Sequence, residues 1–175
     1  VFWGLDAGLA RQRHFPAINW LNSYSLYPQS LDQWFRDNIA QDFPEIRTQV
    51  SGLLQIEAEL QEIVQLVGSD ALPVDQQLTL EVARMIREFF LQQNGFHEVD
   101  AYCDINLQYR MAKAILAFQE SAKSAMASGA QLNDVVNVQS RTDLMRGRFE
   151  KGYIDEIDEM VKKMTAEIAG TVEGN

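Results

Sequence analysis

The sequence predicts a mainly α protein, in which a C-terminal helical bundle follows a short segment of strands and loops. Two observations indicate this fold class. After residue 28, apolar residues recur at intervals of three and four, the period of one helix face. Before it, short apolar runs such as VFWGL and FPAIN are broken by Gly, Pro and Asn, which is typical of strand ends and loops. We therefore divide the chain into residues 1–28 and residues 29–175.

The first predicted helix of the bundle starts within QDFPEIRTQ. Asp42 can cap it, Pro44 suits the first turn, and Glu45 stands three positions after Asp42, as in a capping box. Gly68 ends it in the usual C-terminal place. Its stripe is apolar except for Glu57 and consists of Ile46, Val50, Leu53, Glu57, Leu60, Val64 and Val67.

Three more helices are predicted. The second follows the loop GSDALPVDQQ and stops at Asn94-Gly95, the third runs from about Leu107 to Ser128, and the fourth covers Asp155 to Ala169. Each carries an apolar face, which indicates packing into a common core. The inward residues are Leu78, Val82, Met85, Ile86 and Phe89, then Ala112, Ile115, Ala122 and Met126, then Ile157, Met160, Val161, Met164 and Ile168.

Composition excludes several functional classes. A net charge of -10 argues against nucleic acid as a main partner and against docking on an anionic membrane. The single cysteine, Cys103, excludes a disulfide framework and a thiolate metal cluster. No apolar run approaches the roughly 20 residues that span a bilayer. The start VFWGLDAGLA lacks an initiator Met and a signal peptide, so we expect a piece of a longer protein.

No local motif announces catalysis. The chain has no G-x-x-x-x-G-K-[ST] phosphate loop, no G-x-G-x-x-G and no G-x-S-x-G. His97, Glu98, Asp100 and Cys103 lie close together in the sequence, but their spacing matches no standard metal site. We therefore interpret them as a loop cluster and predict no metal.

Aromatic residues are the stronger signal. Phe96 and Tyr102 flank the loop GFHEVDAYC directly after a helix stop, and Phe15 and Trp20 lie in the irregular stretch RQRHFPAINWLNSY. Loops are where binding residues concentrate. From composition alone, two interpretations stay open: the rings close the end of the bundle, or they bind a ligand.

Three segments carry a resemblance to a known family. They read FWGLDAGLARQRHFPAINWLNSYS, GSDALPVDQQLTLEVARMIREFF and QQNGFHEVDAYC. The first and third resemble segments of the C-terminal portion of the catalytic A subunit of V/A-type (archaeal or vacuolar-type) rotary ATPases and ATP synthases. The second resembles the acidic loop and helix of rotary ATPase catalytic subunits generally. The last forty residues fit by helical character only.

The resemblance implies an adenine pocket. In this family, aromatic residues at the positions of Phe15, Phe96 and Tyr102 surround the adenine, with Ala101 beside them. Adenine offers a flat apolar face on which aromatic rings can stack. Pro16 fixes the chain directly after Phe15. The implied cofactor is ATP or ADP with Mg²⁺ in the parent complex, and none is expected on this fragment alone.

The resemblance also implies what this chain lacks. The phosphate loop and the general base of the family lie upstream, and an arginine comes from the neighbouring B subunit. We therefore expect no catalytic residue in this fragment, and no activity from it alone. The parent subunit would hydrolyse or synthesise ATP coupled to H⁺ or Na⁺ transport. It would alternate with B subunits in a hexameric ring, contact central stalk subunits, and lie in the cytoplasm as a peripheral part of a membrane-bound complex without touching the membrane.

The loop between the first two helices is the expected rotor contact. By analogy with the family it faces the central stalk, and the residues concerned are Ser69, Asp70, Leu72, Val74 and Asp75. We expect Leu72 and Val74 to be exposed and to offer apolar contact, to which the two carboxylates add electrostatic guidance toward a basic shaft. The loop carries fewer acidic residues than in the related ATP synthases, which favours shape contact over a strong charge contribution. The alternative is a plain connector between helices.

A different class of function is also compatible with these residues. A free-standing helical module can use exposed aromatic loops to bind a protein partner. A small metal enzyme built on His97 and Cys103 is a third hypothesis, which the short ligand set disfavours.

Overall fold

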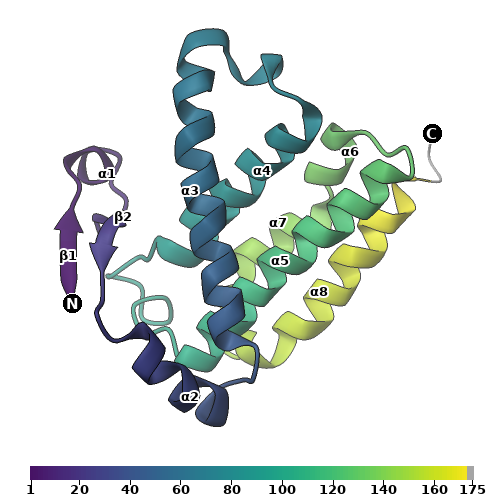
Figure 1. Cartoon of the computed structure of the whole chain (residues 1–175). Helices are drawn as coiled ribbons and strands as arrows, with labels where there is room; N and C mark the ends of the chain where they lie inside the picture. Colours follow the sequence, from purple (N-terminus) through teal and green to yellow (C-terminus); the bar gives the residue numbers. More distant parts are fainter. Residues whose placement is uncertain (173–175) are drawn as a thin grey trace.

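The computed structural model describes residues 1–172, and helices make up most of it (Figure 1). The predicted mainly α fold class is therefore confirmed. In chain order the elements are β1 (Phe2–Leu5), α1 (Ala7–Arg11), β2 (Ile18–Tyr24), α2 (Pro28–Asn38), α3 (Phe43–Val67), the 3₁₀ turn η1 (Ser69–Ala71), α4 (Val74–Met85), the π-helix η2 (Ile86–Leu91), α5 (Ile105–Ala127), α6 (Leu132–Val136), α7 (Gln139–Gly147) and α8 (Tyr153–Gly170).

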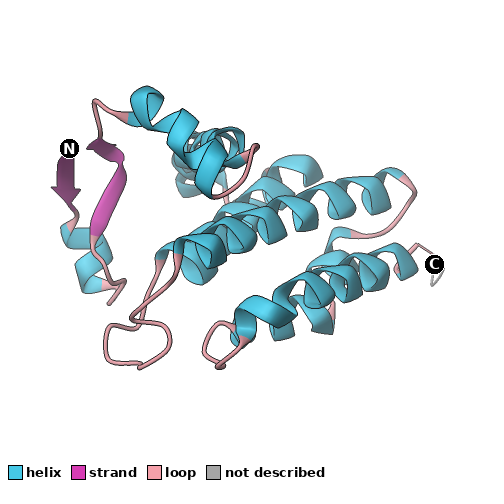
Figure 2. Cartoon of the chain, turned by 90° about the horizontal axis from the view of Figure 1, so that it is seen from below, coloured by secondary structure: helices cyan, strands magenta, loops and turns pink. Residues whose placement is uncertain are grey.

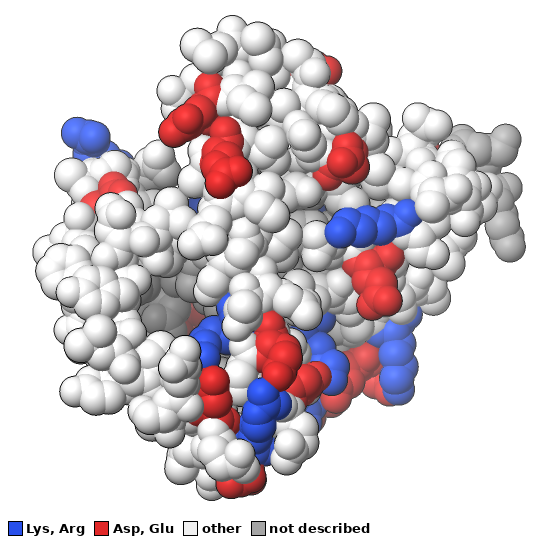
Figure 3. All heavy atoms as spheres, in the orientation of Figure 1, with Lys and Arg blue, Asp and Glu red and all other residues white. Residues whose placement is uncertain are grey.

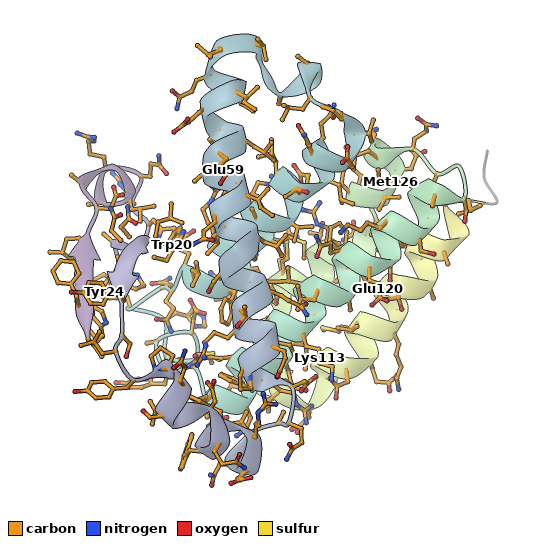
Figure 4. The ribbon with its side chains drawn as sticks, viewed as in Figure 1. Trp20, Tyr24, Glu59, Lys113, Glu120 and Met126 are labelled. Carbon is orange, nitrogen blue, oxygen red and sulfur yellow. The ribbon has the colours of Figure 1, made fainter. Side chains whose placement is uncertain are left out.

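The N-terminal segment is a small hairpin beside the helices. β1 pairs with β2 in antiparallel register, with Leu5 opposite Ile18. The short helix α1 connects the strands, and the Asp6 carboxylate caps it by accepting the amides of Gly8 and Leu9 at 2.7 and 3.1 Å. Figures 1 and 2 show this hairpin apart from the body of the bundle. Its outer face carries exposed aromatic side chains, among them Tyr24, which points away from the bundle in Figure 4.

The core lies where α5 crosses the other helices. α8 runs alongside α5, while α3, α4 and η2 pack against its other faces (Figure 1). All the predicted inward residues belong to this core or pack against it. The largest fully buried side chains are Phe89, Phe118, Leu78, Met85, Ile86, Ile115, Leu144, Ile157, Met164, Ile168, Val82 and Val135.

The predicted capping box at the start of α3 is wrong. The Asp42 side chain caps no backbone amide and instead accepts a hydrogen bond of 2.8 Å from the Tyr109 hydroxyl of α5. That hydrogen bond holds the pKa of Asp42 below its usual value, and the nearby Lys113 ammonium adds a smaller effect in the same direction. Glu45 pairs with Arg36 of α2. Tertiary partners have therefore taken both carboxylates that a local capping box would use.

Glu57, the polar member of the apolar stripe, is explained by a partner on the next helical segment. It is buried on α3 and forms an ion pair with Arg87 of η2. Burial raises the pKa of Glu57, and the Arg87 guanidinium opposes that rise. The pair joins α3 to η2 inside an otherwise apolar interface.

The second predicted helix ends earlier than expected. α4 continues into the π-helix η2, where the Gln92 amide reaches back five residues to the Arg87 carbonyl at 2.8 Å. Gln92 is extended, so the helical path stops at Leu91 and not at Asn94-Gly95. The π-helix occurs mostly as a short insertion near functional sites, which draws attention to the loop that follows it.

Candidate functional site

Two of the aromatic residues singled out from the sequence line one cavity. Phe15 lies between α1 and β2, Phe96 lies in the loop after η2, and both face a cavity of about 600 Å³. Phe15 is 56 % exposed and Phe96 is fully exposed. Rings that open to solvent do not close the end of the bundle, so that interpretation is wrong for Phe96.

Backbone contacts join the two loops. The Gln93 amide donates to the Phe15 carbonyl at 2.6 Å. The Phe15 ring lies against Gly95, where an added Cβ would be 3.2 Å from the ring Cε1. Gly95 therefore permits a close approach, and a side chain there would require the Phe15 ring to shift by a few tenths of an ångström.

His14 anchors the Phe15 loop to the π-helix. Its buried imidazole has Nδ1 at 3.2 Å from the Pro16 carbonyl and Nε2 at 3.1 Å from the Arg87 carbonyl. The ring also packs on Trp20 with centroids 5.4 Å apart, and Figure 4 shows Trp20 between β2 and α3. These contacts give His14 a structural role next to the cavity.

The loop after η2 is held by its own polar side chains. The Asp100 carboxylate accepts the Asn94 amide at 2.6 Å, and the Asn94 side chain accepts the Phe96 amide at 3.1 Å. His97 Nδ1 lies 3.3 Å from the Val99 amide, and the Ala101 amide donates to the His97 carbonyl at 3.0 Å. A loop bonded in this way can present Phe96 at its tip in a fixed place.

Ala101 and Tyr102 lie outside this cavity. Tyr102 is 86 % exposed, and neither residue is among those that line the space between Phe15 and Phe96. The structure thus brings together two of the four predicted adenine residues, and the other two lie further along the same loop.

Arg148 and Phe149 also line the cavity, and neither was predicted from the sequence. They lie in the turn between α7 and α8, far along the chain from the other residues. Burial lowers the pKa of Arg148, while the nearby Asp100 carboxylate opposes that effect. The segment RGRFEKGY has no pattern that predicts a role in a distant loop.

The loop cluster around His97 is committed to the fold. His97 Nδ1 faces backbone amides of its own turn, and Asp100 is bonded to Asn94. Burial is the main effect that raises the pKa of Cys103 to about 11, and the negative charges of Asp100 and Asp104 add to it. This thiol therefore stays protonated at neutral pH. Within residues 1–172, no group of three or more His, Cys, Asp or Glu side chains is arranged to hold a metal ion.

The α3–α4 turn differs from expectation at one residue. Leu72 is buried, so it cannot offer apolar surface to a partner as expected. Val74 is half exposed, and the adjacent end of α3 adds the exposed residues Leu66 and Val67. Gly68 begins the turn with φ 85°, a conformation that favours glycine.

The tip formed by the α3–α4 turn and the adjacent ends of the two helices is also acidic. The chain contains no Lys or Arg from residue 48 to residue 83, a stretch that includes Asp70 and Asp75. In the face seen in Figure 3, the upper part of α3 shows acidic atoms and no basic ones. The tip therefore combines negative charge with a few exposed apolar side chains.

None of the helices in the described part of the chain has the length and apolar character needed to cross a bilayer.

Comparison with known proteins assigns the chain to a family. Residues 32–136 match the family model described as the C-terminal domain of V and A type ATP synthase. The chain is 50% identical over 169 residues to the A subunit of the A-type ATP synthase of Methanosarcina barkeri, covering 97% of this chain and 29% of that protein. It is 51% identical over 173 residues to the V-type ATP synthase alpha chain 1 of Clostridium tetani, covering 96% of this chain and 28% of that protein.

The chain thus spans less than a third of the length of these relatives. The match covers most of the helical bundle, from the middle of α2 through α6. The chain therefore belongs to the family of C-terminal domains of V and A type ATP synthases.

Proposed function

We propose that this chain is the C-terminal part of the catalytic A subunit of an ion-translocating rotary ATPase or ATP synthase. Its relatives carry the names of such subunits, and they extend well beyond the region that this chain matches. In this proposal residues 1–28 are the end of a nucleotide-binding domain, and residues 29–175 are the helical domain that follows it. The exposed aromatic outer face of the hairpin fits a segment that packs against further protein.

The cavity lined by Phe15 and Phe96 is the proposed binding place of adenine. The observation that carries this proposal is the meeting of two exposed rings from distant loops at one cavity, joined by the Gln93–Phe15 backbone bond. A purine needs flat apolar surface more than it needs hydrogen bonds at its edge. Ala101 and Tyr102 would complete the pocket from the same loop when the nucleotide is bound.

The remaining chemistry belongs to other parts of the complex. Mg²⁺ and the triphosphate of ATP need a phosphate loop and carboxylate or hydroxyl ligands, and this chain carries no such loop. Those groups would come from the upstream part of the same polypeptide, and an arginine would come from a B subunit in the alternating ring. We expect the 175-residue chain alone to turn over no ATP.

Substitution of the two rings tests the pocket. In the assembled complex, Phe96→Ala or Phe15→Ala should weaken nucleotide binding by about 1–3 kcal/mol, the typical value of base–aromatic stacking. Because adenine is remote from the bond that breaks, KM should rise more than kcat falls. Tyr102→Ala should act in the same direction. Tyr27→Ala is the control, since this exposed ring is outside the cavity. Unchanged ATP affinity in Phe96→Ala and Phe15→Ala would refute the pocket.

The α3–α4 turn is the proposed contact with the central stalk. Val74, Leu66 and Val67 supply exposed apolar surface, and Asp70 and Asp75 supply negative charge that suits a basic shaft. Ser69 lies beside Asp70 and hydrogen bonds its carboxylate at 3.3 Å. From this turn, α4 and η2 run without interruption to the loop after η2 that carries Phe96, which we call the aromatic loop. Together α4 and η2 form a rod of about 27 Å at the rise of an α-helix. Such a rod can carry a displacement between the two places.

The proposed location follows from the proposed complex. The chain would lie in the cytoplasm as a peripheral part of a membrane-bound assembly. The alternative, a free-standing interaction module, is supported only by the exposure of the aromatic loops.

A further inference from the structure

Arg148 lies in the turn between α7 and α8, outside the residues that the family model matches. It is buried, although it carries a charge. A buried charge costs free energy unless several partners satisfy it, so the contacts of this guanidinium must be extensive.

The first set of contacts is with backbone carbonyls at the C-terminal end of the π-helix η2. The last carbonyls of a helix have no partner within it and need donors from elsewhere. Arg148 Nη1 donates to the carbonyls of Glu88, Phe89 and Gln92 at 2.9, 2.8 and 2.8 Å. One guanidinium therefore closes the end of η2 at the residue where the chain turns into the aromatic loop.

The second contact reaches into that loop. Arg148 Nε lies 3.6 Å from one oxygen of Asp100, and the other oxygen of Asp100 accepts the Asn94 amide at 2.6 Å. Asn94 and Asp100 bracket the turn that carries Phe96. The Arg148–Asp100 pair thus connects the end of η2 to both ends of this turn.

The third contact orders the cavity wall. The Arg148 guanidinium lies 4.6 Å from the centroid of the Phe149 ring, and the His97 ring meets Phe149 edge-on at 5.2 Å. A cation over an aromatic face is favourable, and it fixes both groups. The α7–α8 turn therefore touches the loop through Asp100 and through His97.

We propose that Arg148 is a positioning residue for the nucleotide cavity. It acts through Asp100 to hold the loop that presents Phe96, and it makes the α7–α8 segment part of the framework of the site. The inference rests on the proposed function of that cavity and extends it to the last forty residues of the chain. Arg148 is not assigned a contact with the reacting atoms.

The test uses the full-length catalytic chain in the assembled complex and two readouts. The first is KM and kcat for ATP. The second is hydrogen exchange of the peptide covering residues 92–104 without nucleotide, which reports the order of the loop itself. The variants are Arg148→Met, which keeps a linear apolar stem, Arg148→Lys, and Asp100→Asn, which retains an acceptor for Asn94 but removes the ion pair. Arg146→Met is the matched control, because Arg146 is exposed two residues away.

Arg148→Met is expected to speed exchange of the loop and to raise KM about fivefold or more, while kcat changes less than about twofold. Arg148→Lys should restore part of the loss, because a single ammonium keeps the charge but cannot reach the carbonyls at the end of η2 and also place a second nitrogen against Asp100, as Nη1 and Nε of Arg148 do. Asp100→Asn should give the same pattern more weakly. The double variant Arg148→Met/Asp100→Asn should be little worse than Arg148→Met, since both changes break one pair. Arg146→Met should change neither readout.

The outcomes separate this inference from the proposed function. If Phe96→Ala leaves KM unchanged, the adenine pocket itself is wrong. If Phe96→Ala raises KM but the Arg148 and Asp100 variants do not, Arg148 is only a structural support and the inference is overturned, even where loop exchange is faster. If Arg148→Met fails to assemble, Asp100→Asn decides, since it leaves the three carbonyl bonds in place. An unchanged KM in that variant overturns the inference, whatever its loop exchange shows.

Discussion

Gly147→Ala tests how closely α7 and α8 pack at their junction. Gly147 is the last residue of α7, and the Tyr153 ring of α8 lies directly against it. A Cβ at residue 147 would stand 2.5 Å from Tyr153 Cε2, 2.6 Å from Cδ2 and 3.3 Å from the Met160 sulfur. Carbon atoms in contact are ordinarily about 3.5–4.0 Å apart, so the ring would have to move by about 1 Å.

The cost of this movement can be worked from the contacts of Tyr153. The ring is buried, and its hydroxyl donates to the Leu144 carbonyl at 2.8 Å. A shift of about 1 Å breaks that bond, which costs about 1 kcal/mol, and overpacking adds about 1–3 kcal/mol. Alanine in place of glycine in a helix returns about 0.4–1 kcal/mol. The net expectation is a loss of about 1–3.5 kcal/mol in the free energy of unfolding.

Urea denaturation followed by circular dichroism measures this loss, and Gly52→Ala is the matched control. Gly52 lies inside α3, and a Cβ added there meets no atom within 4 Å. That variant should gain about 0.4–1 kcal/mol, so the same substitution should have opposite signs in the two helices. A Gly147→Ala chain at least as stable as the wild type would refute the close packing of this junction.

Three further predictions concern the pKa of Glu57, the reactivity of Cys103 and the α3–α4 turn. Burial raises the pKa of Glu57 above its ordinary value of 4.5, so the folded state holds this proton more tightly than the unfolded state does. Stability from this group is therefore lost as pH rises from about 4.5 through the raised pKa. The urea midpoint of Glu57→Gln should accordingly gain on that of the wild type as pH rises above about 4.5, and a difference in midpoint that stays constant with pH would contradict the raised pKa. The pKa of the half-buried Cys103 is raised to about 11, so iodoacetamide should label it slowly at about pH 8 and rapidly once the chain is unfolded in urea, and equal rates would contradict the raised pKa. Val74→Ser should weaken binding of the central stalk to the assembled ring without changing the circular dichroism, whereas unchanged stalk binding and rotation would make the turn a plain connector.

Helical periodicity predicted the four long helices of the bundle and missed α1, α2, α6 and α7. The four predicted helices correspond to α3, α4 with η2, α5 and α8. α6 and α7 have 5 and 9 residues, too few turns for a repeating stripe to be recognised. The start of α3 was placed correctly by Pro44, but the role of Asp42 was decided by Tyr109 from a distant helix. Local patterns thus locate helices well, and tertiary contacts decide what their polar residues do.

The candidate site was only partly predictable. The adenine-binding role of Phe15 and Phe96 was predicted from the family resemblance alone, because the two residues lie on separate loops and form no local motif. Arg148 and Phe149 could not have been found in this way, since their importance depends on the α7–α8 turn folding back onto η2. Leu72 was expected to be exposed because it lies in a turn, yet the turn folds it inward.

The buried charges of this domain share one structural element. Arg141 of α7 donates to Glu81 of α4 at 2.9 Å, Arg87 of η2 pairs with Glu57 of α3, and Arg148 binds the carbonyls at the end of η2. A buried ion pair is a weak source of stability, because desolvation offsets most of its attraction. We expect these contacts to fix one defined geometry, whereas apolar side chains pack acceptably in several. These three contacts lie in order along α4 and η2, between the acidic turn and the aromatic loop. In the proposed function, the α3–α4 turn and the cavity lined by Phe15 and Phe96 act on each other. Because α4 and η2 are held at three defined points, a displacement at one end of this rod reaches the other end and is not lost to local rearrangement between them.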